Sequence, residues 1–340
     1  MRLFSSHEAK ALRRSLLLGI LALAPCVAQA APLYTIADLG TLGGTFSGGF
    51  GINAAGQVAG YSNTAGNAAQ HAFISTSTGL TDLGTLGGTN SYGYGINTAG
   101  QVTGYSDTAG NFAAHAFVST STGLIDLGTF GGTNSFGAGI NAAGQVAGTS
   151  DTAGNAAHHA FISTSTGLID LGTLGGTSSV GHGINTAGQV TGYSNIAGGA
   201  THAFVSTSSG LTDLGTLGGT NSYGYGINAA GQVAGISQTA GNADQHPFLF
   251  DGTSMYDLNN LLVPGSGWLL QVAQGINDSG QITGFGFVNH EQHAFRLTLA
   301  DATPVPEPAS AVLLGVGLLG VGLLGTVLRL RRRRHGVLEG

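Results

Sequence analysis

Histidine and aspartate recur at fixed spacing along this chain. Of its side chains, these are the best suited to catalysis or metal binding. The recurring residues are His71, His115, His159, His202, His246 and His293, and Asp38, Asp82, Asp126, Asp170, Asp213 and Asp257. Five of the histidines precede an aspartate by eleven residues. An imidazole can donate a hydrogen bond to a carboxylate and so orient a turn, or the histidines could form a ring of catalytic or metal-binding groups. Because a site usually exists once and six copies indicate a rule of construction, we interpret the pairs as structural.

The elements that must position these pairs belong to a unit of about 44 residues that occurs six times. Each unit also contains a Gly-Ile-Asn segment, which ends at Asn53, Asn97, Asn141, Asn185, Asn228 and Asn277. A repeat of this length indicates one array of similar units rather than two unrelated domains.

Four short strands are expected in each unit. In the first unit, residues 49–53 and 57–61 are expected to form a hairpin around an Asn-Ala-Ala-Gly turn. After a polar loop, residues 71–76 and 80–83 are expected to form a second hairpin, and residues 85–88 to lead into the next unit. Four antiparallel strands in about 44 residues is the size of one β-propeller blade.

The two ends of the array predict a closed ring. The segment Tyr34–Gly40 has no unit before it, and the final His-x-Phe strand, Ala294–Leu299, has no Asp-Leu strand after it. A ring needs such an offset because its first strand completes its last blade, whereas a linear solenoid needs polar caps. We therefore predict an all-β, six-bladed propeller over residues 31–300, closed by its N-terminal strand, in which Asp38 would pair with His293. An open β-solenoid is the alternative.

Composition argues against several classes of function. Of the ten Lys and Arg residues only Arg296 lies between residues 31 and 304, against thirteen Asp and Glu, so the repeats carry a formal charge of about −12. Such a surface repels phosphate backbones, and no nucleic-acid partner is expected. The only cysteine, Cys26, precedes the repeats.

No cofactor, metal site or catalytic residue is predicted. The remaining histidines, which include His158, His182 and His290, show no ligand spacing, and the sequence contains no nucleophile elbow or phosphate loop. Phe50, Tyr94 and Tyr225 are expected in first strands, which line the channel of a propeller. We interpret them as channel filling, with a sugar platform as the alternative.

The sixth unit departs from the others. It carries the extra segment Val263–Trp268, which contains the only tryptophan. A specific contact and a longer corner that closes the ring both explain such an insertion.

The first 30 residues have the layout of a secretory signal. Basic Arg13 and Arg14 precede a short apolar run, and Ala28 and Ala30 form a small-x-small cleavage site before Ala31. The apolar run of about ten residues is too short to span a membrane. A lipoprotein signal is disfavoured because Pro25 stands directly before Cys26.

The other end predicts a membrane-spanning helix. A linker at 301–310 contains Val305, Pro306, Glu307 and Pro308, and an apolar run follows at 311–328. Eighteen residues at 1.5 Å each give about 27 Å, enough to cross the bilayer core. The positive-inside rule places the basic tail, residues 329–340, in the cytoplasm and the repeats outside. Its arginines are Arg329, Arg331, Arg332, Arg333 and Arg334.

The order Pro-Glu-Pro, apolar helix and arginine cluster resembles the PEP-CTERM sorting signal of Gram-negative bacteria. The resemblance covers about 30 residues and implies recognition by an exosortase in the inner membrane, with processing near Pro306–Pro308. A permanent membrane anchor is the alternative.

The repeats have a resemblance of their own. The phrases DLGTLGGTNSYGYGIN, AAGQVAG and HAF recur together from Tyr34 to Leu297 and resemble the HAF-repeat family of extracellular bacterial proteins. That resemblance implies an exported, surface-associated protein and supplies no catalytic residue.

Two functions are consistent with these patterns. The first is a non-enzymatic surface or matrix protein that is exported, passes through the inner membrane and remains on the cell surface or outside the cell. Its expected partners are an exosortase-type protease and an envelope polysaccharide or surface protein. The second is an enzyme that acts on extracellular polysaccharide from the mouth of a propeller.

Overall fold

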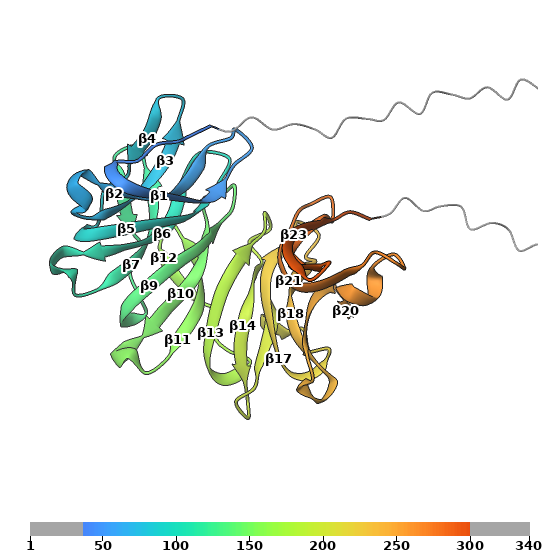
Figure 1. Cartoon of the computed structure of the whole chain (residues 1–340). Helices are drawn as coiled ribbons and strands as arrows, with labels where there is room; N and C mark the ends of the chain where they lie inside the picture. Colours follow the sequence, from blue (N-terminus) through green and yellow to red (C-terminus); the bar gives the residue numbers. More distant parts are fainter. Residues whose placement is uncertain (1–36, 300–340) are drawn as a thin grey trace, which may run out of the picture. The chain divides into compact units, whose positions relative to one another are not determined.

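The computed structural model describes residues 37–299, and in this range the chain is built from antiparallel strands. It forms six sheets that follow one another along the sequence, five of four strands and a last one of three (Figure 1). Each sheet is a meander, in which a strand pairs with its neighbours in sequence. This is the arrangement of a six-bladed β-propeller, and the prediction of an all-β array of antiparallel repeat units is confirmed.

The strands have nearly the same bounds in every sheet. The first sheet contains β1 (Gly43–Ile52), β2 (Val58–Thr64), β3 (Gln70–Thr76) and β4 (Gly79–Asp82). The second contains β5 (Gly87–Ile96), β6 (Val102–Thr108), β7 (Ala114–Thr120) and β8 (Gly123–Asp126). The third contains β9 (Gly131–Ile140), β10 (Val146–Thr152), β11 (His158–Thr164) and β12 (Gly167–Asp170). The fourth contains β13 (Gly175–Ile184), β14 (Val190–Ile196), β15 (Thr201–Thr207) and β16 (Gly210–Asp213). The fifth contains β17 (Gly218–Ile227), β18 (Val233–Thr239), β19 (Gln245–Phe250) and β20 (Met255–Asp257). The last contains β21 (Trp268–Ile276), β22 (Ile282–Val288) and β23 (Glu291–Leu297).

Short 3₁₀ turns interrupt the polar loops. Four have the sequence Ala-Gly-Asn, and their asparagines adopt the left-handed conformation that Asn tolerates well. These are η2 (Ala65–Asn67), η3 (Ala109–Asn111), η4 (Ala153–Asn155) and η5 (Ala240–Asn242), and a fifth, η6 (Leu258–Leu261), follows β20.

The first strand of each sheet is longer than predicted. It begins at Gly43 in the first sheet, where the sequence suggested Gly49, and the expected linker 85–88 already contributes Gly87 to β5. The polar run Thr-Asn-Ser shows no apolar alternation, but its buried serine has a defined partner. Ser91 Oγ accepts from the amide of Ala72 at 2.8 Å and donates to the Gly84 carbonyl at 2.6 Å. Hydrogen bonds thus compensate the burial of a polar strand.

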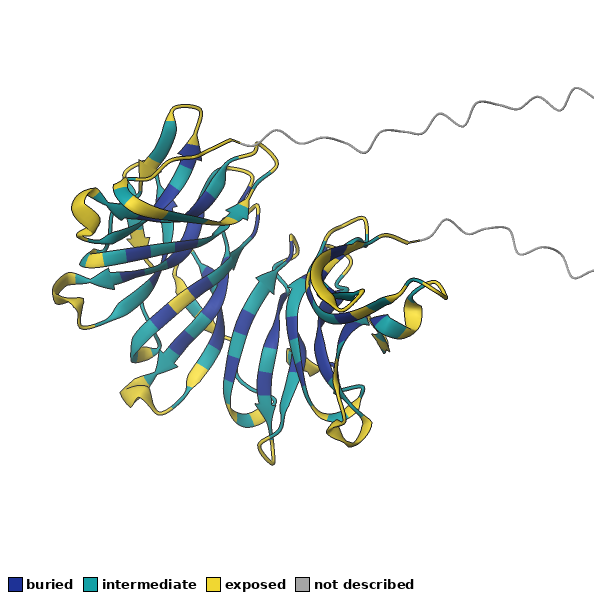
Figure 2. Cartoon of the chain, in the orientation of Figure 1, coloured by how far each residue is buried: buried dark blue, intermediate teal, exposed yellow. Residues whose placement is uncertain are grey.

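Buried residues recur along the strands of every sheet (Figure 2), and the core lies between successive sheets, where large and small residues meet. Phe117 of the second sheet packs with Ala59 and Ala72 of the first, and Phe161 of the third packs with Ala116 of the second. In the His-Ala-Phe strand, the alanine therefore contacts the following sheet and the phenylalanine the preceding one. Five of these phenylalanines are among the largest fully buried side chains of the described residues: Phe73, Phe117, Phe161, Phe204 and Phe248.

The second strand of each sheet approaches the first so closely that only glycine fits at one position. A bulge separates Gly93 from Gly95 in β5, and a Cβ on Gly104 of β6 would overlap the carbonyl oxygen of Tyr92. The same close approach recurs at Gly60, Gly148, Gly192, Gly235 and Gly284. The recurring glycine of the second strand is therefore a packing requirement.

Four predictions fall on residues outside the described range or across its edge. The signal (1–30), the sorting motif (305–308) and the apolar run with its arginines (311–334) lie outside residues 37–299. The described residues include no helix able to cross a membrane. Residues 34–36 of the predicted closing strand also lie outside, residues 37–40 are not assigned to a strand, and β23 pairs with β22.

Candidate functional site

The structure brings together five of the predicted His–Asp pairs at the outer hairpin of their sheets. The imidazole Nδ1 lies 2.8 Å from an aspartate oxygen in four pairs and 2.7 Å in the fifth. Because an ionised carboxylate can only accept, Nδ1–H is the donor. The pairs are His71–Asp82, His115–Asp126, His159–Asp170, His202–Asp213 and His246–Asp257.

Each aspartate also holds the chain that leads to the next sheet. Asp82 Oδ1 accepts from the backbone amide of Gly84 at 2.7 Å, and Asp257 Oδ1 accepts from the amide of Asn259 at the start of η6. The sixth histidine, His293, lies 3.4 Å from Glu291 of its own strand. Each paired aspartate thus accepts hydrogen bonds from a histidine and from a backbone amide, and both bonds hold the scaffold together. Within residues 37–299, no group of three or more potential metal ligands occurs.

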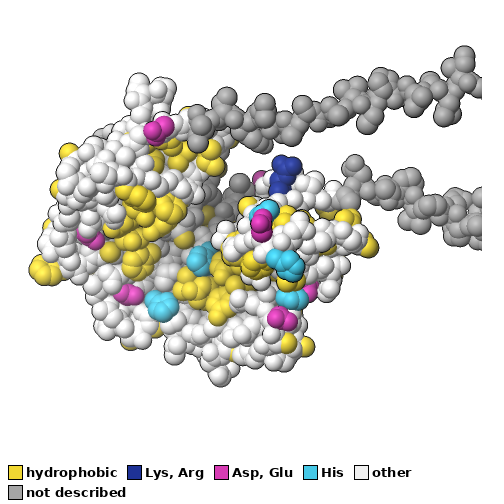
Figure 3. Space-filling model, viewed as in Figure 1, with side chains coloured by type: hydrophobic (Ala, Val, Ile, Leu, Met, Phe, Trp, Pro, Cys, Tyr) yellow, Lys and Arg dark blue, Asp and Glu magenta, His cyan; other side chains and the backbone are white. Residues whose placement is uncertain are grey.

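Aromatic side chains form a second recurring feature, which we call the aromatic row. Rings on the first two strands of neighbouring sheets contact one another: Tyr61–Tyr92 centroids are 5.0 Å apart, and Tyr105–Phe136 centroids are 5.0 Å apart. One segment of the row consists of Phe46, Phe50, Tyr61, Tyr92, Tyr94, Tyr105 and Phe136, and the other of His182, Tyr193, Tyr223 and Tyr225. Figure 3 shows hydrophobic side chains gathered over these sheets, with histidines beside them.

The aromatic row is partly open to solvent. Phe50 is 55% exposed and Phe136 is 41% exposed, whereas partial burial raises the pKa of Tyr92, Tyr105 and Tyr193. Rings of this kind offer rigid apolar area for a ligand. The sequence singled out only Phe50, Tyr94 and Tyr225. An alignment of the six units column by column would have found the others.

A cavity of about 370 Å³ separates the two segments of the aromatic row. It lies between the third and fourth sheets, and its lining includes Phe136, Ala138, Thr149, Asp151, His158 and His182. Burial lowers the pKa of His182, so this imidazole is neutral near pH 7. His158 and His182, which showed no ligand spacing in the sequence, are brought to one cavity by the stacking of two sheets.

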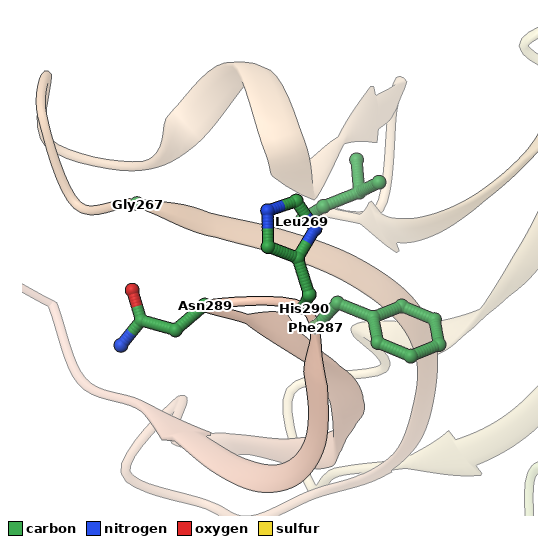
Figure 4. Close-up of a pocket in the computed structure, with 5 residues that line it drawn as sticks. All are labelled: Gly267, Leu269, Phe287, Asn289 and His290. Carbon is green, nitrogen blue, oxygen red and sulfur yellow. The ribbon is translucent and has the colours of Figure 1, made fainter.

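A second hollow, of about 590 Å³, lies on the last sheet beside the inserted segment (Figure 4). Its lining is Gly267, Leu269, Phe287, Asn289 and His290. Asn289 and His290 form the two-residue turn between β22 and β23, and both have positive φ, as a type I′ hairpin turn requires. Trp268 is the first residue of β21, and its ring lies 6.3 Å from that of Phe295. The insertion therefore anchors the corner before the last sheet.

Comparisons with known proteins concern the fold. The propeller domain of the Trilobed protease from Pyrococcus furiosus, described as having an open velcro topology, superposes with a TM-score of 0.51 at 10% identity, over 74% of this chain and 82% of that one. TolB from Acinetobacter baumannii superposes with a TM-score of 0.42 at 13% identity, over 61% of this chain and 52% of that one. A six-bladed lectin from Aleuria aurantia superposes with a TM-score of 0.34 at 12% identity, over 71% of this chain and 86% of that one. The first of these supports assignment to the class of β-propellers.

No family model matches the sequence, and no curated protein matches it.

Proposed function

We propose that this protein is an exported β-propeller that binds a ligand at the cell surface and is not an enzyme. The observation that carries the proposal is that the recurring polar side chains hold the scaffold together, while aromatic side chains are left exposed to contact a ligand. The ionisable groups that recur, His and Asp, hydrogen-bond to each other and to the backbone. Many of the inner-strand side chains that vary between units are aromatic, and Phe50 and Phe136 among them are exposed. Exposed apolar rings favour binding, and the recurring acids and bases already serve to hold the scaffold together.

Export and sorting belong to the same proposal. The signal with cleavage between Ala30 and Ala31, and the PEP-CTERM-like tail with Pro306–Pro308, would deliver the repeats across the inner membrane to the surface. An exosortase-type protease is the expected partner in sorting. An envelope polysaccharide or a surface protein is the expected partner on the outside.

We further propose that the ring closes. The Asn53 side-chain amide donates to the carbonyl of Asn97 at 3.0 Å, and the same bond links every later pair of neighbouring sheets. Asn277 has a matching amide, and its sheet is the last one within residues 37–299, so closure would direct this amide to the carbonyl of Asn53. Likewise, Ala294 is equivalent to Ala72 and would donate to Ser47, the equivalent of Ser91. Closure without an N-terminal strand, as in an open velcro, is the competing arrangement.

The mass and location of the mature protein test the proposed sorting. Intact-mass spectrometry of inner-membrane, outer-envelope and medium fractions is expected to find a species that begins at Ala31, ends near Pro308 and is absent from the inner membrane. A species that keeps Arg331–Arg334 in the inner membrane would contradict sorting and identify a tethered periplasmic protein. Ala28→Asp with Ala30→Asp blocks signal cleavage and serves as the control for export.

A further inference from the structure

The cavity between the third and fourth sheets exists because this interface lacks the aromatic side chains that the first, second and fourth interfaces carry. Each interface between neighbouring sheets has three equivalent positions, two on the earlier sheet and one on the later. They hold Phe50, Tyr61 and Tyr92 at the first interface, Tyr94, Tyr105 and Phe136 at the second, and His182, Tyr193 and Tyr223 at the fourth. At the fifth interface they are Tyr225, Ile236 and Val272, so one ring and two aliphatic side chains remain. At the third interface they are Ala138, Thr149 and Val180, and no ring remains.

Compared with the two neighbouring interfaces, the second and the fourth, the third has three small side chains in place of three large rings. The surrounding scaffold is unchanged, since Asn141 still donates to the Asn185 carbonyl and Ser179 still accepts from the Ala160 amide. The space is therefore left open instead of being closed by collapse of the sheets. At about 370 Å³ it falls within the range of small-molecule sites.

Polar groups in the cavity are available to a ligand. Among residues 37–299, the Thr149 hydroxyl and the ring nitrogens of His158 and His182 have no hydrogen-bond partner. Asp151 lies opposite His158 in the pairing of β10 with β11, and its Oδ2 accepts from the backbone amide and side chain of Asn134, each at 3.1 Å. Fixed in this way, the carboxylate faces the cavity as an oriented acceptor.

Charge and shape indicate the class of ligand. An anionic ligand would need a cation, but the lining of the cavity holds the Asp151 carboxylate and no Lys or Arg, and burial lowers the pKa of His182. A quaternary ammonium ligand would need a cage of several aromatic faces, and Phe136 and His182 supply two. A neutral sugar ring has an apolar C–H face to lie on Phe136 and hydroxyls to donate to Asp151 and to exchange hydrogen bonds with Thr149 and His158.

We propose that this cavity, lined by Phe136, Thr149, Asp151, His158 and His182, is a binding site for a single neutral sugar ring of a surface glycan. The inference rests on the proposed function, since it supplies the ligand class and the place for that binding. It assigns one site for each chain, whereas the repeated architecture by itself would suggest six.

The test fills the cavity with the residues that the second interface carries. The full chain is titrated with methyl glycosides of glucose, galactose, mannose and N-acetylglucosamine, and with tetramethylammonium, by saturation-transfer NMR and calorimetry. At least one glycoside is expected to bind the native protein with 1:1 stoichiometry. Ala138→Tyr with Thr149→Tyr is expected to weaken that binding at least about tenfold. Because Tyr94 and Tyr105 occupy the same positions one unit earlier, this variant is expected to fold.

Two controls make the result specific. Ala142→Tyr adds the same ring on the exposed turn of the same unit and is expected to leave binding unchanged. Thr149→Val keeps the shape of the cavity and removes one hydroxyl, so binding is expected to weaken about fivefold, the effect of one neutral hydrogen bond. A circular dichroism spectrum and melting curve like those of the native protein confirm that each variant folds.

Three outcomes would overturn the inference. They are glycoside binding that survives filling of the cavity, binding of tetramethylammonium without any glycoside, and no binding of any probe. The first leaves the proposed surface-binding function standing and moves its site elsewhere. Failure of export or sorting is seen separately, because the mass and location of the mature protein do not depend on occupation of the cavity.

Discussion

The side-chain amide of Asn97 donates to the backbone carbonyl of Asn141, forty-four residues further along the chain, at 3.0 Å. The same asparagine accepts from the amides of Ala99 and Gln101 and so shapes its own turn. One residue type therefore forms the hairpin within a sheet and ties that sheet to the next. This double role explains why the Gly-Ile-Asn segment recurs in every unit.

Replacing one of these asparagines by aspartate removes the donor to the following sheet. Asn141→Asp leaves the buried carbonyl of Asn185 without its partner, so we expect the free energy of unfolding to fall by about 1–3 kcal/mol. Chemical denaturation measures the loss. Ala142→Asp adds the same charge on the exposed side of the turn and is expected to change little. Equal losses for both variants would contradict the assigned role.

Asn277 reports on closure of the ring. If its amide reaches the carbonyl of Asn53, Asn277→Asp costs as much as Asn141→Asp, because both variants lose one bond within the turn and one between sheets. If the array is open, Asn277→Asp costs about 1 kcal/mol less, since only the bond within the turn is lost. Parallel denaturation of the two variants decides between the ring and the open array.

The buried phenylalanines are expected to dominate stability. Phe161 is fully buried against Ala116 and Val146, so Phe161→Ala should lower the free energy of unfolding by about 3–5 kcal/mol. Phe112 is 87% exposed, and Phe112→Ala should stay within about 0.5 kcal/mol of the native protein. A comparable loss from both variants would mean that the stacking of sheets does not depend on this ring.

The His–Asp pairs are expected to act on stability unequally. Asp170 accepts from His159 and also from the amide of Gly172, so Asp170→Ala should cost about 1 kcal/mol. His159→Ala loses one partly exposed contact and should cost about 0.5 kcal/mol or less. Thermal melting of both variants, with and without added Zn²⁺, tests the structural interpretation. Stabilisation of the native protein by Zn²⁺ that His159→Ala abolishes would favour a metal site.

The free energy of unfolding is expected to depend on pH through His182. Its pKa is lowered because burial disfavours the imidazolium, so below the ordinary histidine value, near 6.5, the unfolded chain binds a proton that the folded chain does not. Stability therefore falls as pH decreases through this range. The rings of Tyr193 and Tyr225 contact His182, and Asp151 and His158 share its cavity.

His182→Tyr, which places the residue of Tyr94 and Tyr225 at this position, removes that titration. We expect the variant to gain stability relative to the native protein as pH falls from 8 to 5, while all other titrating groups cancel in the comparison. Denaturation curves at several pH values provide the measurement. A constant difference between the two proteins would show that His182 does not contribute.

Much of the scaffold was accessible from the sequence, because its determinants are local and repeated. The turn around Asn53, the spacing of His71 and Asp82, and the small-and-large alternation of Ala72 and Phe73 are all read within one unit. The repeat itself implies that units stack on one another. The beginning of β5 at Gly87 was missed, since the burial of its polar run depends on a serine contact with the neighbouring sheet.

The candidate site was decided by tertiary structure alone. Ala138, Thr149 and Val180 are unremarkable small residues in the sequence, and two of them belong to one unit while the third belongs to the next. They become a cavity only when two sheets pack face to face and the neighbouring interfaces place rings at the same positions. The sequence by itself determined the repeat, the pairing residues and the acidic charge. The position of the cavity depends on side chains that are far apart in the chain and meet only when two sheets pack together. It was therefore decided by the tertiary structure.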